Sequence, residues 1–219
     1  MTMKHVINKN GKYDLADITP VYEENYNRGY IGFCYDQTSF VSQAVAQTTK
    51  YCNYSNIKVS HALIVVSKDT CVEADANSKK VIEAPLSKYF DNENKIISFR
   101  KPKESDDVVA GEIVELAKSK IGCGYEYAEI LGHLGKSLPG INQFNKFTYN
   151  VFVDMISCLI DNKDKFICSE LTAYSLKYAQ SRSYGNKGIL SRITTRVNPQ
   201  ELFEDRTIFK EWEMETVNE

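Results

Sequence analysis

Four short runs of β-prone residues follow one another between residues 61 and 100, and residues that favour turns end each run. A separate segment at 85–90 precedes the last run, and the pattern predicts strands over 61–66, 70–76, 80–84 and 95–100. Turn signals at such short intervals are typical of an antiparallel meander, because a hairpin reverses the chain within a few residues. The sequence therefore predicts an antiparallel sheet as the framework of the fold.

Helical spacing of apolar residues appears before and after these strands. Apolar residues recur three and four positions apart over 39–50, 108–120 and 149–160, and a further helix starts at Cys168. Glycines within 121–124 mark the end of the second of these helices. Strands gathered in one section of the chain and helices in others predict an α+β fold.

The chain is long enough to bury a core as one domain. It has 219 residues, of which 42% are hydrophobic and 26% charged, as in ordinary globular domains. Residues 1–28 are polar and rich in asparagine and tyrosine, and we expect them to form an N-terminal extension of a single domain over 29–219. Residues 130–147 contain several glycines, asparagines and lysines, which predicts a long loop within an insertion at 130–165.

Composition argues against several classes of protein. The net charge is −2, whereas dedicated nucleic-acid binders carry a basic excess. No apolar run approaches the roughly 18 residues of a transmembrane helix, so we expect no transmembrane segment. The six cysteines show no CxxC spacing and no zinc-binding cluster with histidine. We see no apolar core of a signal peptide near Met1, so we expect reduced thiols and a cytoplasmic location.

One cysteine lies where a short apolar run meets the first turn of a predicted helix. The segment 166–174 places Cys168 at this junction. Backbone N–H groups without a helical partner and the positive end of the helix dipole both favour a thiolate there, which lowers the pKa of a cysteine. A thiolate is the nucleophilic form, so Cys168 is the candidate nucleophile.

A cysteine nucleophile needs a histidine base, and the base needs a polar group that orients its ring. His61 opens a predicted strand, and a hairpin with its turn at 67–69 would bring Glu73 on the next strand beside it. Asp75 lies on the same face of that strand and is the alternative orienting residue. We prefer Glu73.

Each of these residues also has a plainer interpretation. A cysteine at a helix start is most often a small buried hydrophobic residue, and a histidine beside a strand is most often structural. Cys34 and Cys71 in the β-prone runs, and Cys158 on a helical stripe, are best explained by core packing. It is the combination of Cys168 with His61 that favours catalysis.

The order of these segments resembles the circularly permuted branch of the NlpC-type, papain-like cysteine peptidases, the YiiX-like proteins. The resemblance covers about residues 29–205, with the histidine before the cysteine, and its segments are 29–33, 40–49, 60–65, 72–74, 84–89, 117–125 and 167–171. It implies a papain-like fold, in which a small antiparallel sheet packs on helices and Cys168 begins the central helix.

The resemblance also implies roles for single residues. Cys168 would be the nucleophile, His61 the base and then the acid, and Glu73 the orienting residue. Tyr125 matches a family tyrosine near the active site, and its hydroxyl would stabilise an oxyanion together with the backbone N–H of Cys168. The implied enzyme is a cysteine peptidase or amidase that needs no metal or organic cofactor. Its substrate would be a small peptide, such as a cell-wall-type peptide, or an acyl amide.

Two positions depart from the family pattern, and other functions stay open. Tyr30 stands where an acidic residue is usual, and Leu63 stands where a small residue is usual. Related lecithin–retinol acyltransferases act on lipids, and the aromatic residues Phe144, Phe147 and Phe152 could serve acyl chains.

A lipid-directed acyl hydrolase or acyltransferase, a catalytically silent binding module and a partner-directed protease of mobile genetic origin are therefore alternatives. Contact with a membrane surface stays open, the insertion could cover the cleft as a lid, and the sequence predicts no oligomeric state.

Overall fold

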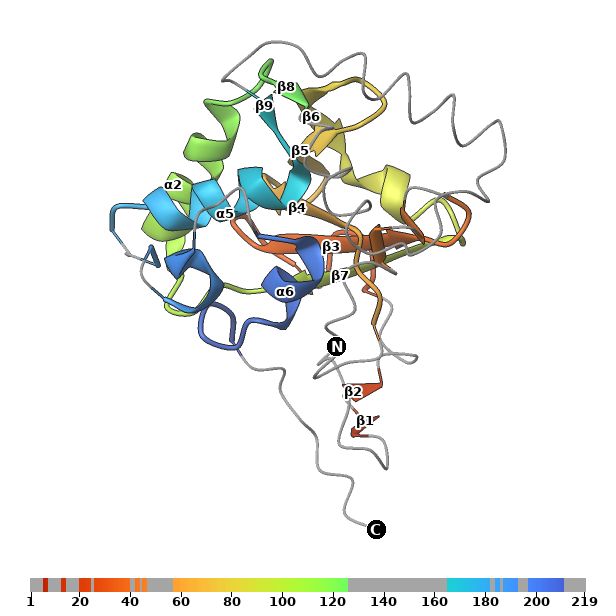
Figure 1. Ribbon diagram of the computed structural model, residues 1–219, viewed down its shortest axis with the longest axis horizontal. Helices are drawn as coiled ribbons and strands as arrows, with labels where there is room; N and C mark the ends of the chain where they lie inside the picture. Colours follow the sequence, from red (N-terminus) through yellow and green to blue (C-terminus); the bar gives the residue numbers. More distant parts are fainter. Residues whose placement is uncertain are drawn as a thin grey trace, which may run out of the picture.

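A curled, mixed sheet of seven strands is the centre of the computed structural model, and helices pack on one of its faces (Figure 1). The strand order is β7-β3-β4-β5-β6-β8-β9. The strands are β3 (Ile31–Asp36), β4 (His61–Val65), β5 (Thr70–Asp75), β6 (Lys80–Pro85), β7 (Lys95–Arg100), β8 (Gly124–Tyr125) and β9 (Lys165–Phe166). Two short strands, β1 (Val6–Ile7) and β2 (Tyr13–Asp14), pair separately.

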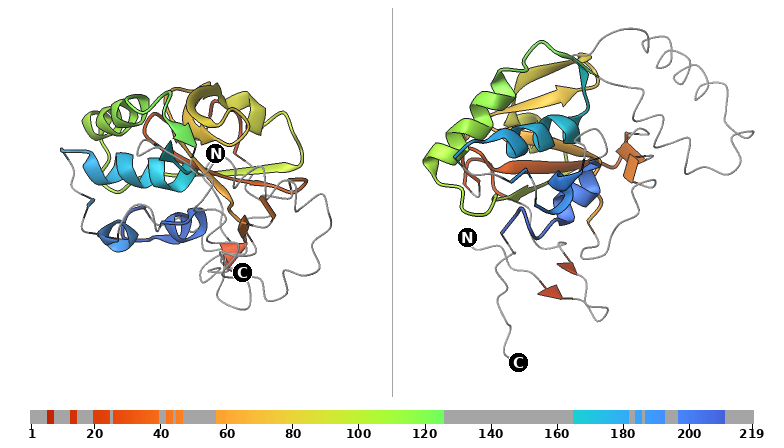
Figure 2. Two further views of the ribbon diagram at one scale, coloured as in Figure 1. Left: turned by 45° about the horizontal axis from the view of Figure 1, so that its top comes forward. Right: turned by 60° about the vertical axis from the view of Figure 1, so that its left-hand side comes forward.

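Three α-helices complete the described fold: α2 (Asp107–Lys118), α5 (Cys168–Tyr178) and α6 (Pro199–Glu204). Two 3₁₀ helices, η1 (Leu86–Tyr89) and η3 (Gly188–Ser191), lie in the connections. Helices α2 and α5 lie side by side in all views (Figure 2), and both contact β4 and β5. The predicted α+β class is therefore confirmed.

The structure describes residues 6–7, 13–14, 20–24, 26–39, 42–43, 45–46, 57–125, 165–181, 184–185, 187–192 and 197–210. The predicted loop at 130–147, the helix at 149–160 and Phe144, Phe147 and Phe152 lie outside these residues. In the described part, no helix is long and apolar enough to cross a membrane.

The predicted meander is correct for three strands and wrong for the fourth. Strands β4, β5 and β6 pair in sequence order and antiparallel. The fourth predicted strand, β7, pairs instead with β3 at the far edge of the sheet, in a register from Ile31↔Arg100 to Asp36↔Lys95. The 3₁₀ helix η1 explains the difference, because it buries Leu86 and Tyr89 after β6 and interrupts the meander there.

The expectation of an antiparallel sheet also needs correction. Strands β8 and β9 pair in parallel, with Gly124 opposite Lys165 and Tyr125 opposite Phe166. Each strand has only two residues, which is too short for an alternating pattern to be visible in the sequence. The sheet is therefore mixed, and its parallel edge leads directly into α5.

The alternation of side chains gives the sheet two buried faces. One face packs under α2 and α5 and includes Phe33, Ile64 and Val72. The opposite face holds a second core that includes Leu63 and Tyr26. Tyr26 is fully buried, so the last described residues of the predicted N-terminal extension pack against the sheet, while the proposed boundary itself stays a prediction.

Candidate active site

Cys168 is the first residue of α5, directly after the parallel edge strand β9. Ile167 precedes it with extended backbone angles (φ −89°, ψ 164°) and has no polar side chain that could cap the helix. The side chain of Ile167 therefore accepts no hydrogen bond from the first N–H groups of α5, which lie beside the thiol. Only 5% of Cys168 is exposed.

Hydroxyl groups allow α5 to be buried although several of its residues are polar. Thr172 Oγ1 donates to the carbonyl of Cys168, and Ser175 Oγ donates to the carbonyl of Leu171, each at 3.0 Å. Ser169 Oγ donates to the carbonyl of Val197 at 2.6 Å. These bonds satisfy hydroxyls that would otherwise be costly to bury, so the start of α5 is held within the core.

His61 begins β4 and lies between the thiol and a carboxylate. Its Nε2 donates to Oε2 of Glu73 at 2.7 Å, which leaves Nδ1 as the ring nitrogen for the thiol. The thiol of Cys168 lies close enough to the ring for hydrogen bonding and charge to shift the pKa of each group. The side chain of His61 is 22% exposed, whereas that of Glu73 is 1% exposed. The order thiol, imidazole, carboxylate is the arrangement of a nucleophilic triad.

The charges of these three groups stabilise one another. Burial alone would raise the pKa of the Cys168 thiol, but the His61 charge, its hydrogen bond and backbone hydrogen bonds from Ala62 and Ser169 lower it. Burial opposes the charged imidazole, yet Cys168 and Glu73 raise the pKa of His61 to about 10. Against its own burial, Glu73 has a pKa lowered to about 2 by His61 and Lys88. All of these interactions favour a thiolate–imidazolium pair over two neutral groups.

Glu73, and not the alternative Asp75, contacts the imidazole. The pairs Ile64↔Val72 and Val65↔Cys71 set the register of β4 with β5. The carboxylate of Glu73 therefore reaches His61 diagonally along the same face. Asp75 Oδ2 accepts instead from the backbone N–H of Ser78 at 2.8 Å, in the turn after β5.

Two further residues contact the carboxylate, and neither was singled out from the sequence. Lys88 Nζ and Tyr89 OH in η1 both donate to Glu73. The Tyr89 ring also stacks near His61, with centroids 6.2 Å apart and planes 22° apart. The segment 84–89 was part of the resemblance, but only the 3₁₀ turn shows that two adjacent side chains converge on one carboxylate.

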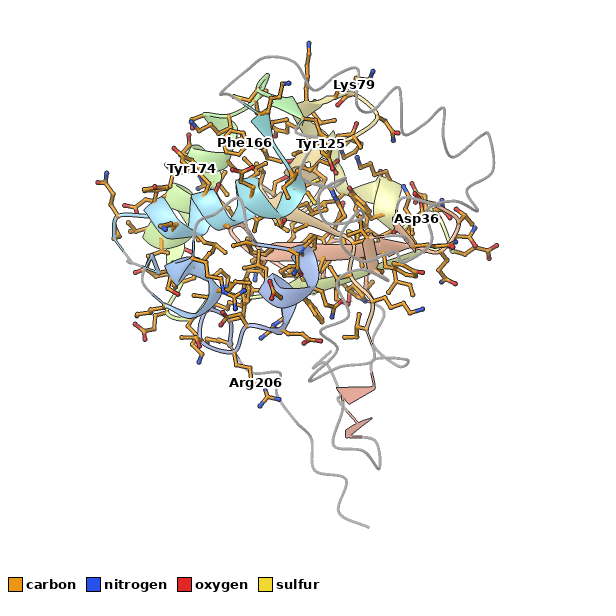
Figure 3. All side chains as sticks on the ribbon, in the orientation of Figure 1. Asp36, Lys79, Tyr125, Phe166, Tyr174 and Arg206 are labelled. Atoms are coloured by element: carbon orange, nitrogen blue, oxygen red, sulfur yellow. The ribbon has the colours of Figure 1, made fainter. Side chains whose placement is uncertain are left out.

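Tyr125 lies at the parallel edge of the sheet, where the chain enters α5. It pairs with Phe166, two residues before Cys168, and Figure 3 shows both side chains at this edge. Its backbone N–H donates to the carbonyl of Lys79 at 3.0 Å. The side chain is 7% exposed and belongs to the helix-side core. Its role at an oxyanion stays a prediction.

Leu63, the departure from the family pattern, has a packing partner across the sheet. Gly32 faces Leu63 in β3, and a Cβ added to Gly32 would lie 2.5 Å from Leu63 Cδ1. The leucine therefore fills the space that the glycine leaves. Its bulk is directed into the second core, on the face that also carries Glu73.

Two of the other described cysteines, Cys34 and Cys71, differ from Cys168. Cys34 and Cys71 are buried and free. Burial, and then the charge of Glu73, raise the pKa of both thiols well above the ordinary value. Their assignment to the core agrees with the second hydrophobic cluster, whereas Cys158 lies outside the described residues.

Comparison with known proteins adds no assignment. No family model matches the sequence, and no curated protein matches it. Within the described ranges, no group of three or more His, Cys, Asp or Glu side chains could hold a metal ion. The geometry around His61 is therefore the main indication of function.

Proposed function

We propose that this chain is a cysteine hydrolase with a permuted papain-like fold, and that it cleaves an amide bond in a small peptide or acyl amide. The observation that carries the proposal is the position of His61 between the Cys168 thiol and the Glu73 carboxylate. The resemblance to the YiiX-like branch supports it, since the histidine precedes the cysteine and Cys168 begins a helix.

The reaction would begin with attack of the Cys168 thiolate on the carbonyl carbon. The carbonyl π electrons move to oxygen, and in this proposal the backbone N–H of Cys168 stabilises that oxyanion. Collapse of the intermediate breaks the C–N bond, and His61 gives its proton to the leaving amine. The product of this half-reaction is a thioester on Cys168.

Water would then release the acyl group. His61, now neutral, takes a proton from water as the oxygen attacks the thioester carbon. The C–S bond breaks, the thiolate returns, and His61 is again an imidazolium. Glu73 holds the ring through Nε2 in both halves of the cycle.

The experiment that tests this function combines a substrate panel with trapping of the acyl-enzyme. The purified full chain is assayed on γ-linked peptides, cell-wall-type peptides and acyl esters, in parallel with Cys168→Ala. Turnover of peptides with a mass adduct on Cys168, both lost in the variant, is the expected result.

The other outcomes decide between the alternatives. Turnover of acyl esters alone would replace the amidase by the lipid-directed function. A folded protein whose Cys168 forms no adduct with any substrate and reacts like an ordinary thiol would leave a silent binding module.

A further inference from the structure

The carboxylate of Glu73 has more partners than the orientation of a histidine requires. Oε2 accepts from His61 and from Tyr89, and Oε1 accepts from Lys88. Its side chain is 1% exposed, while that of Lys88 is 31% exposed. Lys88 thus brings a positive charge from the surface to a carboxylate that water does not reach.

The positive charge of Lys88 matters at the step of the proposed reaction in which His61 loses its proton. When His61 gives its proton to the leaving group, the imidazole becomes neutral and no longer compensates Glu73. A buried carboxylate without a counter-charge is strongly unfavourable, so a pair made of His61 and Glu73 alone would resist this proton transfer. Lys88 keeps the carboxylate compensated in both states of the histidine.

We propose that Lys88 is a positioning residue that, with Tyr89, fixes the Glu73 carboxylate and balances its charge, so that His61 can alternate between its two protonation states. The inference rests on the proposed hydrolase function, because it concerns the same histidine. Lys88 acts through Glu73 and touches neither the thiol nor, in this proposal, the substrate.

The other groups around the carboxylate do not supply this charge. Cys34 from β3 and Cys71 from β5 face Glu73, and their thiols stay neutral because burial and Glu73 raise their pKa values. Tyr89 donates a hydrogen bond but is uncharged, since burial and Glu73 raise its pKa well above the ordinary value. Of the side chains that the structure describes, Lys88 and His61 are the cations bonded to Glu73.

A neighbouring lysine offers a matched control. Lys88 Nζ lies 5.0 Å from the centroid of the Tyr89 ring, and Lys95 Nζ lies 5.3 Å from the same centroid. Lys95 donates to the carbonyl of Lys88 at 3.4 Å rather than to Glu73. Lys95→Met therefore removes one positive charge beside the same ring without removing a partner of the carboxylate.

The test measures how the alkylation of Cys168 by iodoacetamide depends on pH, together with kcat and KM where a substrate has been found. The full-length parent is compared with Lys88→Met, Lys88→Gln, Lys88→Arg and Lys95→Met. Lys88→Gln keeps a hydrogen-bond donor without the charge, so it carries the test if Lys88→Met fails to fold.

The alkaline limb of the pH profile for Cys168 alkylation reports the loss of the proton from His61. We expect this limb to move to higher pH when the Lys88 charge is removed, because His61 should then bind its proton about tenfold more tightly. The kcat should fall by about tenfold with KM little changed, because a less acidic imidazolium is a poorer proton donor. Lys88→Arg should restore both properties, and Lys95→Met should match the parent.

Two results would overturn the inference: profiles of Lys88→Met and Lys88→Gln that match the parent, or an equal shift in Lys95→Met. Failure of the proposed function looks different, because it appears in the parent itself. There, Cys168 would show no thiolate below the pH at which ordinary thiols ionise, whatever residue 88 is.

Discussion

The thiol at the start of α5 and the thiols inside the sheet are similarly buried but differ in their chemistry. Cys168 is 5% exposed and Cys34 is 4% exposed. The pKa of Cys34 is nevertheless raised by burial and Glu73, whereas that of Cys168 is lowered, against its burial, by His61 and backbone N–H groups. Burial alone therefore does not decide in which direction the pKa of a cysteine is shifted.

The difference lies in what stands between each thiol and Glu73. The imidazole of His61 separates Cys168 from the carboxylate and offers it a positive charge. Cys34 also faces His61 across the β3–β4 ladder. For this thiol, however, the charge of Glu73 raises the pKa, as burial does. Of Cys34 and Cys168, it is Cys168 that combines a helix start with a histidine that carries a positive charge, and its pKa is the one that is lowered.

Removal of the histidine should have the largest effect on this comparison. In His61→Ala, Cys168 loses the cation that opposes its burial, so its pKa should rise towards those of the sheet cysteines. We expect its alkylation by iodoacetamide at neutral pH to fall by roughly 100-fold. Peptide mapping by mass spectrometry follows each cysteine separately.

Cys123 is the internal control in that experiment, because it is more exposed than Cys168. Its labelling should be the same in the parent and in His61→Ala. If Cys123 reacts faster than Cys168 in the parent at neutral pH, accessibility rather than ionisation governs labelling, and the comparison fails.

The second prediction concerns acid. Glu73 has a pKa lowered from 4.5 to about 2, by His61 and Lys88 against the opposing effect of burial. Because the folded-state pKa lies below the unfolded one, the stabilisation is present above pH 4.5 and is lost as the pH falls towards 2. The loss should amount to about 3 kcal/mol. Urea unfolding midpoints measured across this range test it.

An exposed glutamate provides the control for this measurement. Glu73→Gln should flatten the acid dependence, whereas Glu115→Gln should leave it unchanged. The side chain of Glu115 is 70% exposed and pairs with Arg28 at 3.4 Å, and such surface pairs contribute little. Equal slopes for the parent and Glu73→Gln would show that other carboxylates cause the loss.

The sequence could predict that Cys168, His61 and Glu73 come together, because each lies on an element whose local pattern is visible in the sequence. Cys168 follows an apolar run, and His61 and Glu73 sit on strands separated by one turn. Lys88 and Tyr89 could not be predicted, since their convergence depends on a 3₁₀ turn of four residues. The position of β7 was missed for a related reason: strand pairing at a sheet edge is decided by long-range contacts, not by local pattern.

A substitution at Gly32 tests how tightly the side chains inside the sheet are packed. A Cβ at this position would lie 2.5 Å from Leu63 Cδ1 and 3.1 Å from Phe99 Cε1. We expect Gly32→Ala to destabilise the fold by about 1–3 kcal/mol. Because Leu63→Ala removes the atoms that the new Cβ would meet, Gly32→Ala should cost less in a Leu63→Ala background than in the parent. Thermal or urea unfolding measures both.

A glycine on the helix side should respond in the opposite direction. A Cβ at Gly111 in α2 would meet only the guanidinium of Arg28, at 3.8 Å or more. Gly111→Ala should therefore stabilise the protein by about 0.5–1 kcal/mol. Destabilisation of equal size at Gly32 and Gly111 would contradict a local clash with Leu63.

The smallest effect on the reactivity of Cys168 is expected for Cys34→Ala. The thiol of Cys34 is neutral because burial and Glu73 raise its pKa, so its removal takes away packing but no charge. We expect a loss of about 1 kcal/mol in stability and an unchanged pH profile for the alkylation of Cys168. Cys71→Ala, which removes a thiol that donates to the carbonyl of Ala84 at 3.5 Å, should behave alike. If Cys34→Ala shifts the pH profile of Cys168 alkylation and Cys71→Ala does not, the Cys34 thiol is electrostatically coupled to Cys168 and His61. The distinction between the two kinds of cysteine would then be wrong.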